Sequence, residues 1–152
     1  MAVSEALLGV VAGLRSALPL ALLVRTAERD GTLARLPAPV RRGPGARYLA
    51  LAALGELVVD KLPQTGSRIE PERLGGRVAA GAAVGAAAVR RAGRPMVLGA
   101  ALGAAGAVAG SYGGYRLRKA VVERTSLPDP VVALGEDALA LGLGSLAVRR
   151  RA

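Results

Sequence analysis

Residues 95–115 read PMVLGAALGAAGAVAGSYGGY, a run of 21 residues without a charged side chain. A helix of this length rises about 30 Å, which matches the hydrocarbon core of a bilayer. The run therefore predicts a transmembrane helix. Its glycines recur at intervals of three and four residues, a spacing that lets membrane helices approach closely. We expect helix contacts at five of them: Gly99, Gly103, Gly106, Gly110 and Gly114.

Four further apolar stretches have lengths between a half-span and a full span. They are residues 6–24, 48–59, 78–89 and 130–148. The charged segments between the stretches predict hydrophilic connectors at residues 25–47, 60–77, 90–94 and 116–129. We therefore predict an all-α fold, a polytopic membrane helical bundle with four to five spans, in one integral-membrane domain over residues 1–152.

Four short strings recur in the same order in the two halves of the chain. GVVAG at residues 9–13 matches GAVAG at 106–110, Arg25-Thr26 matches Arg124-Thr125, LPAPV at 36–40 matches LPDPV at 127–131, and ALGE occurs at 53–56 and 133–136. These matches predict an internal repeat, with one copy at about residues 5–62 and the other at about residues 95–148. The bias of the composition toward alanine and glycine is the alternative explanation.

The segment at about residues 74–93 would link the two copies as part of a tightly packed helical hairpin with the uncharged run. Gly81 and Gly85 lie on one face of this segment and predict its contact surface. If the segment crosses the bilayer, the second copy begins three spans after the first and is inverted. Inverted repeats are typical of secondary transporters, whose sites lie between the copies.

Charged residues within the apolar stretches define the candidate site. An intramembrane arginine or aspartate costs roughly 2.5–3.5 kcal/mol, so each needs a partner or water. Pro19 removes a helical hydrogen bond four residues after Arg15, which predicts a kinked or broken helix around a buried cation. We predict a substrate or ion site at Arg15, Glu56, Asp60, Lys61, Glu136 and Asp137. The alternative is a static ion pair of Arg15 with Glu56 or Glu136.

The connector DKLPQTGSRIEPERLGGR at residues 60–77 is too polar for hydrocarbon and predicts an ordered loop or re-entrant turn. Guanidinium groups bind phosphate in a bidentate manner, so we predict anion or lipid-headgroup contacts at Arg68, Arg73 and Arg77. The alternative is that these side chains only extend to the membrane interface.

The composition excludes several classes of function. The chain has no cysteine and no histidine, which removes disulfides, thiol nucleophiles, most zinc sites and histidine acid–base pairs. A net charge of +10 is compatible with nucleic acid or an anionic membrane, but the only aromatic residues are three tyrosines, so base stacking is disfavoured. We expect the lipid bilayer as partner, with an anionic lipid and a second copy of the chain as further partners. We expect no nucleic acid, metal or cofactor.

Four segments together resemble a known family. GLRSALPLALL at residues 13–23, GELVVDKLPQTGSR at 55–68, GGR at 75–77 and ALGEDALALGL at 133–143 are similar to the bacterial integral-membrane family called domain of unknown function 4126. The pattern E-x-x-x-D-K-x-P, formed here by Glu56, Asp60, Lys61 and Pro63, is the most specific part. The resemblance implies a small multi-pass protein of the bacterial inner membrane. It brings no established reaction or ligand.

Together these features predict a transporter- or channel-like protein for a small solute or ion, and not an enzyme. The alternative is a non-transporting membrane scaffold or lipid-binding accessory protein, in which the same charges form static pairs. A membrane enzyme acting on lipid is a third hypothesis, and it would need a carboxylate as its base because histidine and cysteine are absent.

Overall fold

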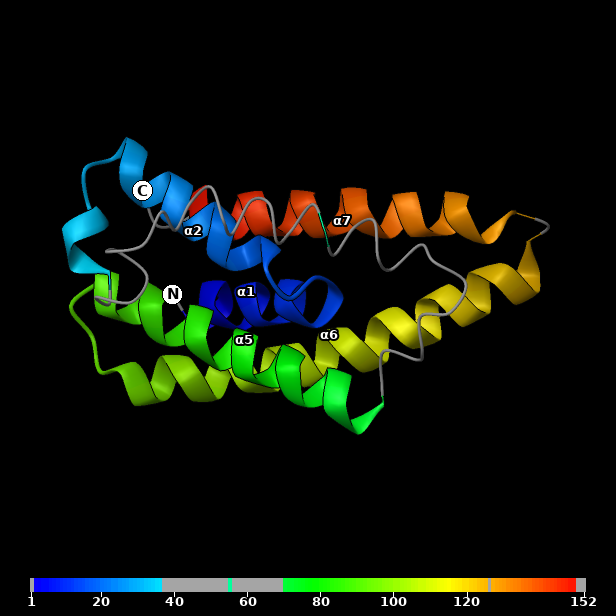
Figure 1. The fold of residues 1–152 in the computed structure, drawn as a ribbon, viewed down its shortest axis with the longest axis horizontal. Helices are drawn as coiled ribbons and strands as arrows, with labels where there is room; N and C mark the ends of the chain where they lie inside the picture. Colours follow the sequence, from blue (N-terminus) through cyan, green and yellow to red (C-terminus); the bar gives the residue numbers. More distant parts are fainter. Residues whose placement is uncertain (1, 37–54, 56–69, 126, 150–152) are drawn as a thin grey trace.

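A computed structural model of the chain describes residues 2–36, 55, 70–125 and 127–149. Within this part the protein is all-helical, as predicted, with five α-helices and one short 3-10 helix. The elements are α1 (Ala2–Leu14), α2 (Leu18–Arg29), η1 (Leu33–Arg35), α5 (Pro71–Arg91), α6 (Met96–Arg124) and α7 (Asp129–Arg149). The long helices α5, α6 and α7 follow the long axis of the molecule, and α1 lies among them (Figure 1).

The turn between α5 and α6 has a clear local cause. Gly93 adopts a φ of +70°, a conformation that side chains disfavour. This lets the amide of Arg94 donate to the carbonyl of Val89 and that of Gly93 donate to Arg90, both at 2.9 Å. Pro95 follows and caps the next helix. The two helices therefore form an antiparallel hairpin, which Figure 1 shows at the lower edge of the bundle.

Glycines form the interface of this hairpin. A methyl group at Gly85 would overlap the carbonyl group of Gly99, and one at Gly103 would overlap that of Gly81. The two backbones therefore pack directly on each other, with no side chain between them. This places four of the predicted contact glycines, Gly81, Gly85, Gly99 and Gly103, at one shared surface.

Glycines also form the interface between α1 and α6. Methyl groups at Gly9 and Gly13 would overlap carbonyl groups of α6. Methyl groups at Gly106 and Gly110 would overlap carbonyl groups of α1. The fifth predicted glycine of α6, Gly114, is buried. Thus α6 is in backbone contact with two neighbours, α5 and α1.

The break that Pro19 predicts is present, but the chain reverses there. Arg77, early in α5, contacts the end of α1, whereas Arg91, at the end of α5, contacts Asp30 just after α2. These two arginines are 14 positions apart, or about 21 Å along the helix. Because α1 runs parallel to α6, and so antiparallel to α5, α2 returns toward the end from which α1 started.

Residues 6–24 are therefore not one span, contrary to the sequence-based prediction. Hydropathy gives the length of an apolar stretch but does not show whether the chain reverses direction within it. The structure replaces that span with a helical hairpin, α1–α2, whose turn at residues 15–17 lies inside the bundle.

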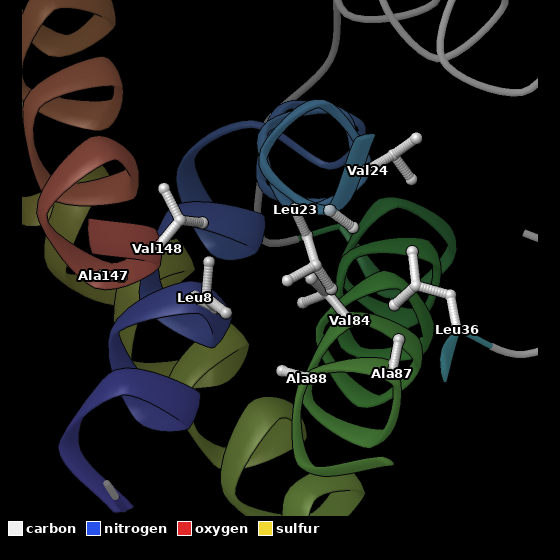
Figure 2. Close-up of a cluster of buried hydrophobic side chains, with 10 residues drawn as sticks. Leu8, Leu23, Val24, Leu36, Val84, Ala87, Ala88, Ala147 and Val148 are labelled. Atoms are coloured by element: carbon white, nitrogen blue, oxygen red, sulfur yellow. The ribbon is translucent and has the colours of Figure 1, made fainter. Parts of the chain in front are cut away.

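The core that holds this hairpin is built from small and branched aliphatic side chains. Leu8 of α1, Leu23 of α2 and Val84 of α5 are fully buried in one cluster. Figure 2 shows Leu23 and Val84 pointing toward each other, with Leu8 and Val148 on the side of α7. The hairpin is thus clamped between α5 and α7.

Two of the described helices are long and apolar enough to cross a membrane, namely Met96–Arg124 and Pro130–Arg149.

Two of the predicted connectors are shorter than expected, because α6 continues to Arg124 and α5 begins at Pro71. Residues 116–124 contain no glycine or proline to end a helix, and Lys119 and Glu123 form an i,i+4 ion pair. Residues 48–59, a predicted stretch, lie outside the described part except for Gly55.

The two strings GVVAG and GAVAG lie side by side on α1 and α6. Their helices run parallel, so this pair lacks the inverted orientation that the sequence predicted. A second pair shares a local contact: Thr26 and Thr125 each donate to the carbonyl four residues earlier, at 2.8 and 2.7 Å. The first copies of the other two strings lie at least partly outside the described residues.

Two alanine substitutions on α6 test the glycine interface. We expect Gly103→Ala to destabilise the protein by about 1–3 kcal/mol, because the new methyl group overlaps backbone atoms that cannot move aside. We expect Gly113→Ala, where no described atom of a neighbouring element lies within 4 Å, to stabilise it by about 0.4–1 kcal/mol. Thermal unfolding in detergent measures both. Equal shifts of Tm in the same direction would contradict the packing.

Candidate functional site

The turn between α1 and α2 places a charged side chain in the interior. Arg15 follows the last residue of α1 and is only 1% exposed. Its Nε donates to Oδ1 of Asp137 on α7 at 2.8 Å, and its Nη2 forms an ion pair with the same oxygen. Its Nη1 donates to the carbonyl of Leu14 at 3.1 Å. Arg15 therefore connects the tip of the hairpin to α7 through charge-assisted hydrogen bonds.

A second buried arginine reaches the same point from α5. Nη1 of Arg77 donates to the carbonyl oxygens of Gly13 and Leu14 at 2.5 and 2.9 Å. The hydroxyl of Ser111 on α6 donates to the Gly13 carbonyl at 3.2 Å. The last carbonyls of a helix lack intrahelical partners and carry the negative end of the helix dipole. Cationic donors from two chain segments therefore compensate the end of α1.

The neighbouring carboxylate has a different partner. Glu136 is buried on α7, and its Oε2 lies 3.5 Å from Nη1 of Arg118 on α6. Both residues border a cavity of about 260 Å³ between α6 and α7. The rest of its lining consists of Gly135 and six aliphatic side chains, those of Leu117, Val121, Leu127, Val131, Val132 and Leu139. The ion pair thus forms one polar patch on an apolar groove.

The structure brings together some of the predicted site residues. Arg15 pairs with Asp137, and Glu136 pairs with Arg118. The predicted residues Glu56, Asp60 and Lys61 lie outside the described part of the chain.

The two described arginines that were predicted to bind an anion or lipid headgroup, Arg73 and Arg77, have different surroundings. Arg73 is partly exposed, with Nε 4.0 Å from Oε2 of Glu70 one turn earlier. Arg77 is 4% exposed and bonds to the end of α1, because residues 71–77 form the first two turns of α5 and not a loop. Arg68 lies outside the described residues. Within the described part, Arg73 and Arg77 thus do not share one anion site.

Sequence reasoning missed Ser111 and Arg118. Arg118 was assigned to a connector, although its spacing from Lys119 and Glu123 fits a helix that simply continues. The prediction for the uncharged run considered only its glycines and so left out Ser111. In the residues that the structure describes, no three carboxylates gather where they could hold a metal ion.

The arrangement is a compensated charge cluster within a bundle of otherwise small apolar side chains. Two arginines face one aspartate and the dipole of a helix end. Asp137 anchors Arg15, which lies at the turn of the hairpin. Within the described residues, the site therefore consists of charged groups held in place by one another.

Comparisons of the chain with family models, with curated proteins and with solved structures find no match. The resemblance to the family called domain of unknown function 4126 therefore stays a prediction.

We expect the removal of one partner of the buried Arg15–Asp137 pair to destabilise the protein. Asp137→Asn removes the carboxylate charge that Arg15 binds and should lower the free energy of unfolding by about 3–5 kcal/mol. The double variant Arg15→Gln/Asp137→Asn should recover most of that loss, because a neutral pair keeps hydrogen bonds without an isolated charge. Thermal unfolding in detergent measures both, with Glu123→Gln as the exposed control. A double variant as unstable as the single one would contradict this assignment.

Arg77 and Arg73, one turn apart on α5, form a matched pair for the helix end. Arg77→Ala removes the bonds to the carbonyls of α1, so amide hydrogen exchange in the last turn of α1 should accelerate at least tenfold. Arg73→Ala removes only a partly exposed ion pair and should leave that exchange unchanged. Equal exchange in the two variants would show that Arg77 does not secure α1.

Proposed function

We propose that the chain is a multi-pass membrane protein. Its described surface and interior have the polarity expected for a lipid environment. Large aliphatic residues are exposed along α6 and α7, including Val97 at 81% and Leu134 at 57%. In contrast, Arg15, Arg77 and Asp137 are buried. Small residues form the helix interfaces. This is common in lipid, where helices associate by close packing because there is no hydrophobic driving force between them.

In this proposal α5, α6 and α7 cross the bilayer, and α1–α2 enters from one side and returns to it. A backbone turn at membrane depth is tolerated only where protein or water satisfies it. Here Arg77 and Ser111 bond to the carbonyl groups at the turn. Residues 48–59 supply a fourth span if their predicted helix forms. A bacterial inner-membrane location follows from the resemblance alone.

We propose further that the protein conducts or transports a proton or small cation. The observation that supports this function is the Arg15–Asp137 pair at the tip of the hairpin. An intramembrane ion pair is costly, and such groups commonly mark ion pathways. A cation that binds Asp137 would displace Arg15, so that site occupancy and the position of the hairpin are coupled.

The second candidate is a membrane scaffold without transport. The observation that favours it is that both buried carboxylates of α7 have arginine partners, Asp137 with Arg15 and Glu136 with Arg118. In that case the pairs only fix the order of the helices, and no ion competes for them. The two candidates differ in what a neutral pair does to activity.

Ion flux in proteoliposomes separates the two candidates. Purified protein is reconstituted with an entrapped pH-sensitive dye, and a potassium diffusion potential drives proton or sodium entry. We expect wild-type flux above that of protein-free liposomes. We expect Arg15→Gln/Asp137→Asn to reduce flux to background while Tm stays within a few degrees of wild type.

Glu123→Gln is the matched control, since it removes a carboxylate that is exposed at the surface of α6. It should retain wild-type flux. Background flux from a folded wild-type protein, or undiminished flux from the neutral double variant, would refute transport through this site and favour the scaffold.

A further inference from the structure

A second polar cluster lies at the opposite end of α5, where α2 ends. The guanidinium of Arg91 forms an ion pair with Asp30, and its Nε donates to the hydroxyl of Thr32 at 2.6 Å. The Asp30 carboxylate also accepts the backbone amide of Thr32 at 3.1 Å, in a local turn after Gly31. Arg91 is therefore held in one position by the segment that follows α2.

Arg91 also borders an open pocket of about 520 Å³. The pocket is lined by Ala34, Arg35, Arg90, Arg91, Ala92 and Gly93, so three of its six residues are arginines and none is acidic. Small residues keep it open, and the glycine of the α5–α6 turn adds no side chain. The chain therefore brings three guanidinium groups around one space from two distant segments.

Two of these arginines are not compensated. Among the described residues, Arg35 and Arg90 form no ion pair, and Arg90 contacts only the sulfur of Met96 at 3.8 Å. Both side chains are exposed. Arg91 is balanced by Asp30, so the surplus positive charge of the pocket comes from Arg35 and Arg90. Guanidinium groups favour oxyanions with several acceptor oxygens, of which phosphate is the best match.

The distribution of charged residues also favours an anionic ligand at this end of the bundle. In the described ranges it carries seven arginines and two exposed acidic residues: Arg25, Arg29, Arg35, Arg90, Arg91, Arg94 and Arg149, against Glu28 and Asp30. The opposite end carries six basic residues, Arg73, Arg77, Arg116, Arg118, Lys119 and Arg124, and four acidic residues near the helix ends, Glu70, Glu72, Glu123 and Asp129. The more basic end is expected on the cytoplasmic side, next to an anionic leaflet.

We propose that the pocket between Arg35 and Arg90 binds a phosphate group. The source is the headgroup of an anionic phospholipid or a free phosphate. The lipid source rests on the proposed membrane location, whereas the free-phosphate source does not. Arg35 and Arg90 bind the phosphate oxygens, and the Asp30–Arg91 pair holds η1 against the end of α5 so that the two arginines stay opposed.

Lipid retention in native mass spectrometry tests this site. The detergent-solubilised protein is titrated with phosphatidylglycerol and, separately, with phosphatidylcholine. We expect selective retention of phosphatidylglycerol by the wild type, and about tenfold or greater weakening in Arg35→Gln/Arg90→Gln. The matched control is Arg25→Gln/Arg29→Gln, which removes the same charge from exposed positions at the same end but outside the pocket. It should weaken retention less than threefold.

Titration with inorganic phosphate, followed by amide chemical shifts of Ala92 and Gly93, distinguishes the two sources. Phosphate binding that depends on Arg35 and Arg90, without lipid retention, assigns the pocket to a free phosphate. Retention that depends on these residues assigns it to a lipid. Equal loss in the two double variants, or no binding of either probe by a protein with unchanged Tm, overturns the site. Because the flux assay does not use this pocket, its failure would leave this result intact.

Discussion

The described structure depends on how the end of α1 is satisfied inside the bundle. A helix that stops inside a bundle leaves carbonyl groups without intrahelical partners, and an arginine buried there needs compensation of its charge; either alone would be costly. Arg15 bonds to Asp137, and Arg77 bonds to the carbonyls of Gly13 and Leu14. These contacts join the α1–α2 hairpin to α5 and α7. Without them a helix of 13 residues could not end in the interior.

Close backbone packing makes this arrangement geometrically feasible. The glycines of α6 bring both α1 and α5 to backbone contact, so short side chains such as Ser111 reach the end of α1. Arg77 lies one turn before Gly81, and Ser111 directly follows Gly110. The glycine surfaces and the charge cluster are therefore one structural unit, in which a shift of α6 would also break the polar contacts.

The sequence predicted the features that depend on local spacing. Glycines three and four residues apart lie on one helix face wherever the helix goes, and Pro19 weakens a helix whatever surrounds it. The sequence did not predict the reversal after Leu14, because the length of an apolar stretch does not show whether the chain turns back within it. Nor did it predict that α5 begins at Pro71, which fits the first turn of a helix as well as it fits a loop. The Arg15–Asp137 pair joins positions 122 residues apart, and spacing alone cannot choose it over Glu136.

The α1–α2 hairpin requires that α1 and α2 enter and leave the bundle at the same end. Since the chain contains no cysteine, single cysteines at Val3, Glu28 and Glu123 can be labelled with a membrane-impermeant thiol reagent in oriented vesicles. All three residues are exposed. We expect positions 3 and 28 to be labelled from one side and position 123 from the other. Labelling of positions 3 and 28 from opposite sides would show that residues 6–24 cross the membrane once, and would contradict the hairpin.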